Sequence, residues 1–131
     1  MKAYNVDDFA VLIGIDWADK KHDICEHPLY SKSYHYSIIK SKPEALHDWA
    51  MDLKKRYPNQ KIAVVCELKK GPLIYALTKY EHLTLFTVNP STVAKYRKAF
   101  TPSGAKAEPS DAFVEVEMTT IHMTKLLVIE P

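Results

Sequence analysis

The chain contains little of what marks a secreted, zinc-binding or membrane-spanning protein. Its 131 residues include two cysteines and three glycines, and the formal net charge at pH 7 is only +2. Cys25 and Cys66 belong to no CxxC pair and lie in apolar runs, so the sequence predicts neither a disulfide framework nor a zinc site. No segment approaches the roughly eighteen consecutive apolar residues of a membrane-spanning helix, and residues 1–8 do not resemble a signal peptide. We therefore expect a cytoplasmic protein that does not enter a membrane.

What the chain does contain suits one domain with one core. Hydrophobic residues make up 47% of the sequence, and 131 residues are too few for two domains, so we assign residues 1–131 to a single domain. The positive and negative charges nearly balance. A nucleic-acid partner would therefore be held by a local basic patch and not by the field of the whole molecule.

The spacing of apolar residues predicts three strands followed by alternating helices and strands. Runs rich in branched apolar residues predict strands at 10–17, 22–27, 32–39, 61–66 and 83–88. Helical spacing predicts helices at 43–57 (capped by Ser41), 71–80, 91–100, and from Pro109 toward His122. Residues 101–107, with proline, glycine and serine, should form a loop. Because parallel strands need crossover helices, the order βββαβαβα predicts an α/β fold: a mixed five-stranded, RNase H-like sheet with helices on both faces.

One acidic residue lies where an isolated charge is costly. Asp16 sits in the most apolar segment of the chain, where an ionised carboxylate needs compensation by a metal ion or by hydrogen bonds within a strand. Glu67 ends the strand at 61–66, which should run parallel to the first strand and beside it. The two carboxylates should then approach each other where those strands end, although an acid at a strand end is often merely solvated.

Two more acids stand at the start of the last predicted helix. Glu108 and Asp111 are three residues apart and so share one helical face, although acids also favour helix N-termini through the helix dipole. Clustered carboxylates are the ligands of Mg2+ (or Mn2+), and two such ions roughly 4 Å apart assist the chemistry of a phosphodiester. We expect Asp16, Glu67 and Asp111 to converge on one site, with Glu108 at its edge and Asp16 bridging two ions.

Several longer motifs occur in a characteristic order. They are the run GIDWADKKHD at 14–23, Glu67 followed by LKKGP, the Asn-Pro pair at 89–90 with YRKAF behind it, and PSGAK before a later Asp-Ala pair. Together they span nearly the whole chain. This combination resembles the N-terminal domain of the DEDD transposases of the IS110 insertion-sequence family, relatives of the Piv invertases.

The resemblance implies catalytic residues and partners. The family's RuvC-like domain has four metal-binding acids at positions that match Asp16, Glu67, Glu108 and Asp111, although the family usually has aspartate where this chain has Glu108. Family members continue through coiled-coil-like helices into a domain with a catalytic serine, so we expect this chain to be a fragment or a truncated gene product. For the full protein the resemblance implies DNA transposition and site-specific recombination guided by a structured RNA. Element ends, target DNA and further copies of the chain are the implied partners.

Basic residues flank the predicted loop and the first acid. We expect phosphate contacts from Lys20, Lys21, Lys95, Arg97, Lys98 and Lys106. Tyr96 and Phe100 are interleaved with these residues, and their spacing of four also fits the buried stripe of a helix. The histidines are scattered, and we assign none of them to metal.

Two other classes of protein compete with a catalytic domain. Actin-like kinases also begin with an apolar strand and an aspartate, but their phosphate loop needs glycine and threonine soon afterwards, whereas Asp16 is followed by WADKK. The stronger alternative is a catalytically inactive remnant that only binds nucleic acid, favoured by Glu108 and by the missing second domain. Metal-dependent cleavage of nucleic acid distinguishes the remnant from an enzyme.

Overall fold

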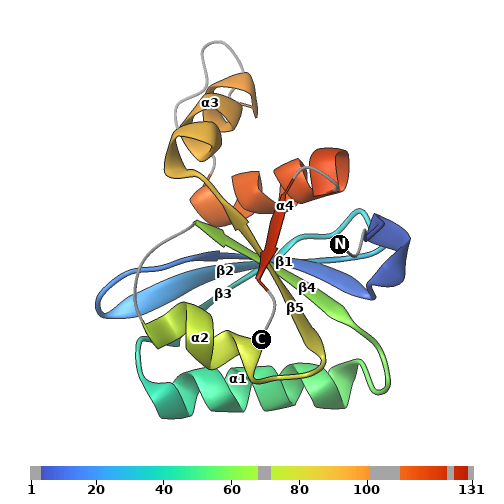
Figure 1. Ribbon diagram of the computed structural model, residues 1–131, viewed down its shortest axis with the longest axis vertical. Helices are drawn as coiled ribbons and strands as arrows, with labels where there is room; N and C mark the ends of the chain where they lie inside the picture. The colour runs from blue at the N-terminus through green and yellow to red at the C-terminus, as the bar shows by residue number, and fades with distance from the viewer. Residues whose placement is uncertain (1–3, 68–71, 101–109, 124–125, 130–131) are drawn as a thin grey trace.

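The chain folds around a mixed β-sheet (Figure 1). The computed structural model describes residues 4–67, 72–100, 110–123 and 126–129. The strands are β1 (Val11–Asp16), β2 (Lys21–Pro28), β3 (His35–Lys40), β4 (Ile62–Glu67), β5 (Leu83–Val88) and β6 (Leu127–Ile129). The helices are the 3-10 turn η1 (Val6–Asp8), α1 (Pro43–Arg56), α2 (Pro72–Thr78), α3 (Pro90–Phe100) and α4 (Asp111–His122).

The strands lie in the order β3-β2-β1-β4-β5-β6. The strands β1, β4 and β5 run parallel, while β2, β3 and β6 pair antiparallel with their neighbours. The predicted α/β fold is confirmed, and its mixed sheet is consistent with the RNase H-like arrangement. The sheet has one strand more than the five predicted, because β6 is a three-residue strand and such a short segment shows no periodicity.

Each face of the sheet has its own core and its own helices. On one face, α1 and α2 pack over alternate residues of the central strands, such as Ile13, Ile15 and Val64. On the other face, α4 and the first turns of α3 cover the intervening residues, such as Leu12 and Val65. Because side chains alternate between the two faces along a strand, these clusters fix the face to which every strand residue points. Helices on both faces, as predicted, are confirmed (Figure 1).

The helix ends depend on local chemistry, and one predicted cap is wrong. The residue that precedes α1 is Lys42, not Ser41, and it makes no side-chain cap, because Pro43 occupies the first turn, where a missing N–H costs nothing. The helix α4 begins behind Ser110, whose side chain accepts a hydrogen bond from the Phe113 amide at 3.2 Å. This cap fixes the position of the first turn of α4.

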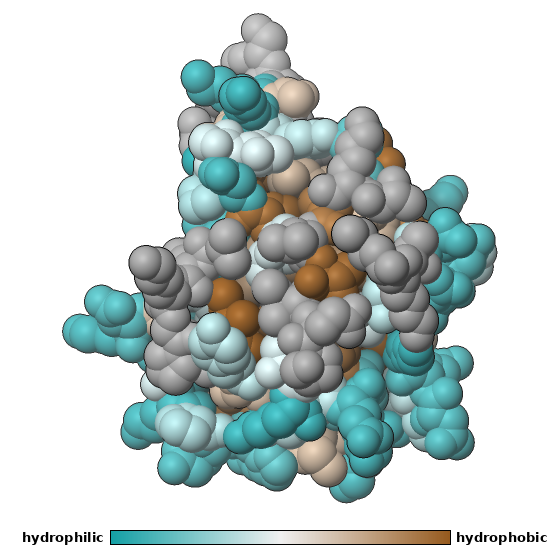
Figure 2. Space-filling view, viewed as in Figure 1, coloured by the Kyte–Doolittle hydropathy of each residue, from teal (hydrophilic) through white to brown (hydrophobic). Residues whose placement is uncertain are grey.

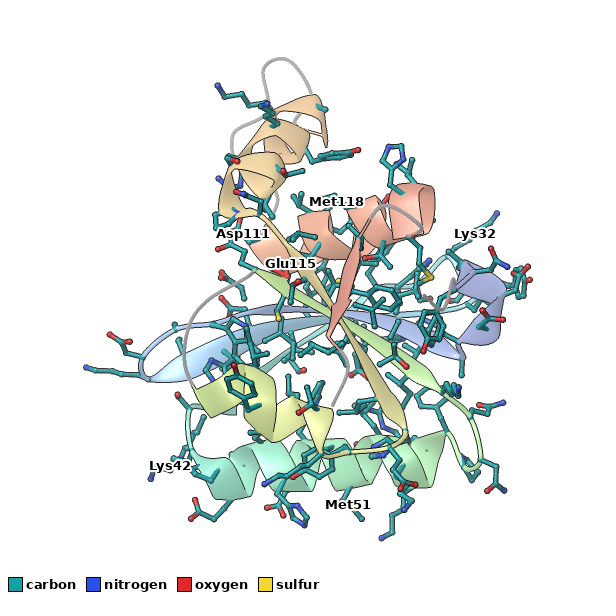
Figure 3. All side chains as sticks on the ribbon, viewed as in Figure 1. Lys32, Lys42, Met51, Asp111, Glu115 and Met118 are labelled. Carbon is teal, nitrogen blue, oxygen red and sulfur yellow. The ribbon has the colours of Figure 1, made fainter. Side chains whose placement is uncertain are left out.

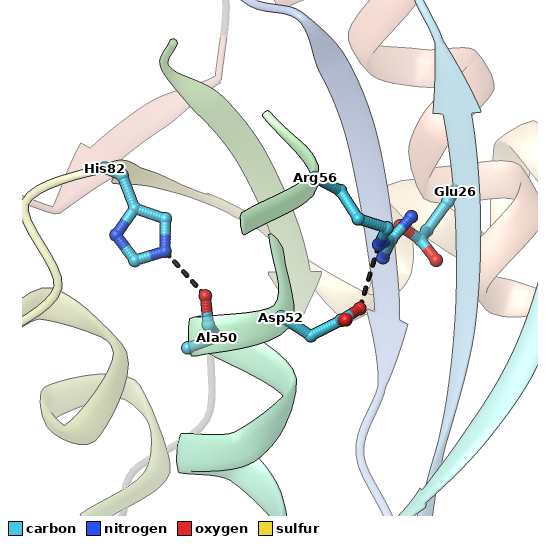
Figure 4. Close-up of polar contacts among 5 residues, drawn as sticks. All are labelled: Glu26, Ala50, Asp52, Arg56 and His82. Atoms are coloured by element: carbon cyan, nitrogen blue, oxygen red, sulfur yellow. Dashed lines mark hydrogen bonds and ion pairs between the residues drawn. The ribbon is translucent and has the colours of Figure 1, made fainter. Parts of the chain in front are cut away.

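Ion pairs join the helical layer of α1 to the sheet. Arg56 at the end of α1 donates hydrogen bonds to Glu26 of β2 at 2.9 Å and to Asp52 at 2.8 Å (Figure 4). Burial lowers the pKa of Arg56, but these two carboxylates outweigh burial and raise the pKa overall. His82, in the turn before β5, contacts the Ala50 carbonyl in the middle of α1 at 2.8 Å (Figure 4). Hydrophilic side chains predominate over the α1 region of the surface, and most of the hydrophobic residues in view lie toward its middle (Figure 2).

Candidate functional site

The central strands carry Asp16 and Glu67 to one edge of the sheet. Ile15 pairs with Cys66 in the parallel register of β1 and β4, so the next residue on each strand is one of these two acids. Side chains alternate between the two faces along a strand, so Asp16 points to the same face as Leu12, and Glu67 to the same face as Val65. Leu12 and Val65 lie beneath α4. The structure therefore places Asp16 and Glu67 at the carboxyl ends of adjacent strands, half-buried and on the face that α4 covers.

Gly14 allows the start of α4 to cross directly over β1. A Cβ atom at Gly14 would lie 2.1 Å from the Ala112 carbonyl oxygen, a distance that no real side chain permits. Asp111, the first residue of α4, precedes Ala112, and Gly14 lies two residues before Asp16 on the same face. The close crossing thus brings Asp111 to the part of the sheet that carries Asp16. In Figure 3, Asp111 lies at the start of α4, one turn before the buried Glu115.

Asp111 forms an ion pair with Arg97 of α3. The two side chains are 22% and 27% exposed, so the pair is partly shielded from water. The sequence had suggested Arg97 as an exposed phosphate ligand, but in the structure its guanidinium is directed to a carboxylate of the predicted acid site. Tyr96 packs against the core beneath α4 and against His122, as expected for the buried stripe of a helix.

The hairpin β1–β2 adds an acid that the sequence analysis missed. Asp23 is the cross-strand partner of Asp16, and directly opposed residues point to the same face. A cleft of about 470 Å³ lies between this hairpin region and the start of α4; its lining residues are Asp23, Ile24, Tyr36, Ser37, Ile38, Ser110 and Ala112. Like charges that face each other across a strand pair are unfavourable, so this edge favours a cation. The strands expected at 10–17 and 22–27 are joined by a short turn, which favours a hairpin, and pairing them residue by residue is the signal that could have revealed Asp23.

The other predicted nucleic-acid residues differ in their accessibility. Lys20, Lys21, Lys95 and Lys98 are exposed. Glu108 and Lys106 lie outside the described residues. His22, the second residue of β2, is 1% exposed, and its Nδ1 accepts a hydrogen bond from the Ala18 amide at 3.2 Å. His22 therefore stabilises the turn that separates Asp16 from Asp23.

A second polar cluster joins β2 and β3 to α4. The Tyr34 hydroxyl hydrogen-bonds to Glu117 of α4, and its ring stacks on His27 at 4.3 Å between centroids. The buried thiol of Cys25 hydrogen-bonds with the Tyr36 hydroxyl. Burial raises the pKa of Cys25 to about 11, because the hydrogen bond from Tyr36 only partly offsets desolvation and the nearby carboxylates. Cys25 is a neutral, packed thiol, as expected from its apolar surroundings.

The described part of the chain contains no group of three or more histidine, cysteine, aspartate or glutamate side chains that could hold a metal ion. Asp16 and Glu67 thus share an edge but form no such group with Asp111, which is paired with Arg97, so the predicted convergence of the three acids on a metal site stays a prediction. Across the same described ranges, no helix is long and apolar enough to cross a membrane.

The architecture and the acidic edge together define an α/β domain consistent with the RNase H-like fold. The family model of the DEDD transposases of the IS110 type, described as transposase, matches residues 13–130. This match covers most of the chain, so the chain belongs to that family, which supports a role in DNA transposition or recombination. No curated protein matches the chain.

Proposed function

We propose that this chain is a metal-dependent domain of a DNA transposase that acts on phosphodiesters at the edge formed by Asp16, Glu67 and Asp111. The observation that supports the proposal is that Asp16 and Glu67 lie on the sheet face on which α4 begins. Two adjacent parallel strands end in carboxylates on one face, and Gly14 lets α4 begin over the same strand. Membership of the transposase family supports the same reading.

The chemistry of the donor set fits a hard divalent cation. The side chains at the edge are carboxylates, which Mg2+ and Mn2+ prefer, and Asp16 faces a second acid, Asp23, across the strand pair. A cationic group, Arg97, already neutralises Asp111. On sequence grounds Glu108 completes the set. Two bound ions would supply an activated nucleophile and stabilisation of the leaving oxygen.

The residues of the chain would have distinct tasks in this proposal. Asp16, on the central strand, would hold metal together with Glu67 of the adjacent strand and Asp111 of α4. Lys20, exposed in the turn after β1, and Lys21, exposed at the start of β2, would contact the phosphates of the substrate strand. Target and element DNA, a structured guide RNA and further copies of the chain remain the proposed partners of the full transposase.

A comparison of Asp16→Asn with Asp48→Asn tests the metal site. Asp48 is exposed on α1, which packs on the opposite face, so its variant controls for the loss of one negative charge. Asp16→Asn should abolish Mn2+ binding, measured by electron paramagnetic resonance, and metal-dependent cleavage of labelled branched DNA. Asp48→Asn should retain both. Because Asp16 faces Asp23, removing its charge should leave the melting temperature of the metal-free protein unchanged or raise it.

Other results would contradict the proposal in different ways. Unchanged Mn2+ binding in Asp16→Asn would exclude this edge as the metal site. A large loss of stability in the metal-free variant would instead make Asp16 a structural hydrogen-bonding residue. Nucleic-acid binding without any metal-dependent cleavage by the unaltered chain would favour the binding-only remnant, which the Arg97–Asp111 pair makes the second candidate.

A further inference from the structure

Two large apolar side chains are exposed beside the acidic edge. Tyr36 and Ile38 of β3 are 61% and 57% exposed. Their cross-strand partners are Cys25, in the core beneath α4, and Asp23, so both point to the face that carries Asp16. Large apolar side chains exposed together on one face often mark a binding surface. We refer to Tyr36 and Ile38 as the β3 platform.

The platform is ordered by contacts from below. A hydrogen bond joins the Tyr36 hydroxyl to the buried thiol of Cys25, which anchors one end of the phenol ring in the sheet. Such an anchor reduces the conformational entropy that binding would cost, since the ring is already oriented. One end of the ring is thus held by the sheet, while most of the side chain is exposed.

The space above the platform has the size of a ligand site. The cleft of about 470 Å³ is bounded by Tyr36 and Ile38 on the sheet and by Ser110 and Ala112 at the start of α4. Binding pockets for small ligands span roughly 300 to 1,000 Å³ and combine apolar walls with a few polar groups. Asp23 supplies a polar wall toward the acidic edge, so an occupant of the cleft would lie next to the proposed metal site.

Charge beside the platform favours a phosphate-bearing occupant. Lys21 at the start of β2 and Lys40 at the end of β3 are cross-strand partners, exposed and on the same face as the platform. Along these two strands an apolar platform is thus followed by a pair of lysines. An aromatic surface next to basic side chains is the pattern by which proteins hold single strands, with bases stacked and phosphates paired.

We propose that the β3 platform stacks an unpaired base of a single-stranded nucleic acid, while Lys21 and Lys40 bind its phosphates. This inference rests on the proposed function, because it places the strand beside the edge that would act on it. The platform should accept any base, since every base has an aromatic face and the lining residues offer no complete hydrogen-bonding pattern.

Anisotropy of a labelled single-stranded oligonucleotide in EDTA tests the platform separately from the metal site. Tyr36→Ala should weaken binding by about tenfold, equal to roughly 1.4 kcal/mol and within the range for one stacked base. Tyr36→Phe keeps the ring and should stay within about threefold of the unaltered chain. Tyr75→Ala, which removes a still more exposed tyrosine from α2 on the other face, should have no effect.

Salt dependence and an abasic oligonucleotide distinguish stacking from phosphate contact. Tyr36→Ala should keep the salt slope of the unaltered chain, whereas Lys21→Ala should lower it by about one. An oligonucleotide with abasic sites should bind the unaltered chain as weakly as Tyr36→Ala binds the complete one. Equal affinity of Tyr36→Ala and the unaltered chain, in a variant whose melting curve shows it folded, would overturn the platform while leaving the metal proposal standing. If Tyr36→Ala instead abolishes self-association and leaves nucleic-acid binding unchanged, the surface binds a second copy of the chain. That result would also overturn the proposal.

Discussion

Gly14→Ala should separate α4 from β1 and thereby disturb both stability and the proposed site. The added Cβ would lie 2.1 Å from the Ala112 oxygen, whereas real Cβ contacts stay above 3.0 Å. The first turn of α4 must therefore withdraw by at least the difference, 0.9 Å. The obstacle is backbone, so no side chain can rotate away to relieve the contact.

The magnitude follows from two opposing effects. Inserting a methyl group into a packed core costs about 1 to 3 kcal/mol, and replacing glycine by alanine within a strand returns roughly 0.5 to 1 kcal/mol. We expect a net loss of about 1 to 2 kcal/mol in the free energy of unfolding. For a chain of this size that loss lowers the melting temperature by roughly 3 to 8 °C. Because Asp111 moves with α4, Mn2+ binding should weaken in the same variant.

Urea unfolding followed by circular dichroism measures this loss. Ser37→Ala is the matched control, since Ser37 is an exposed strand residue of β3 and its substitution should stay within about 0.5 kcal/mol of the unaltered chain. If Gly14→Ala is also that close to the unaltered chain, the start of α4 is not seated on β1. The reasoning that places Asp111 beside Asp16 would then be refuted.

Two further predictions concern charge and protonation. Arg97→Gln should tighten Mn2+ binding by about fivefold, because the guanidinium no longer competes for Asp111. Lys98→Gln, which removes an exposed neighbouring cation, should change the Mn2+ affinity by less than about twofold. Equal Mn2+ affinities of the two variants in calorimetry would exclude the competition. Burial raises the pKa of Cys25 from 9.0 to about 11, so the folded state retains the thiol proton at a pH where the unfolded chain loses it. The free energy of unfolding should therefore fall by roughly 2 to 3 kcal/mol as the pH rises from 9 toward 11. Cys25→Ser should decline less over that pH range in urea unfolding, and an identical decline would show that this thiol does not titrate as stated.

The sequence predicts the elements of the fold well because the pattern of burial is local. The prediction of a strand at 83–88 coincides with β5, and the helix at 43–57 differs from α1 by one residue. Strands buried on both faces read as continuous apolar runs, as in β1 and β4. The prediction of Ser41 as the helix cap was wrong. A serine before a helix often caps it, but α1 begins at Pro43, one residue later than a cap at Ser41 requires.

The arrangement of the candidate site is harder to predict, because it depends on contacts between distant segments. The pairing of Asp16 with Asp23 follows from the register of the hairpin, and the ion pair of Arg97 with Asp111 follows from the packing of α3 on α4. Neither appears in the spacing of charges along the chain. The exposure of Tyr36 likewise depends on how far α4 extends over the sheet, which the sequence of β3 does not contain.

The acidic edge and the β3 platform lie on strands that differ in local stability, because these strands hold different positions in the sheet. The amides of β1 and β4 are flanked by strands on both sides and covered on both faces, so their hydrogens should exchange only when the whole domain opens. Asp16 and Glu67 are attached to these most protected strands. In contrast, β3 is an edge strand whose residues are largely exposed, and it can open locally at a smaller cost in free energy. The acidic edge therefore belongs to the rigid centre of the domain, while the surface that would hold a base lies on a strand that can adjust to its ligand.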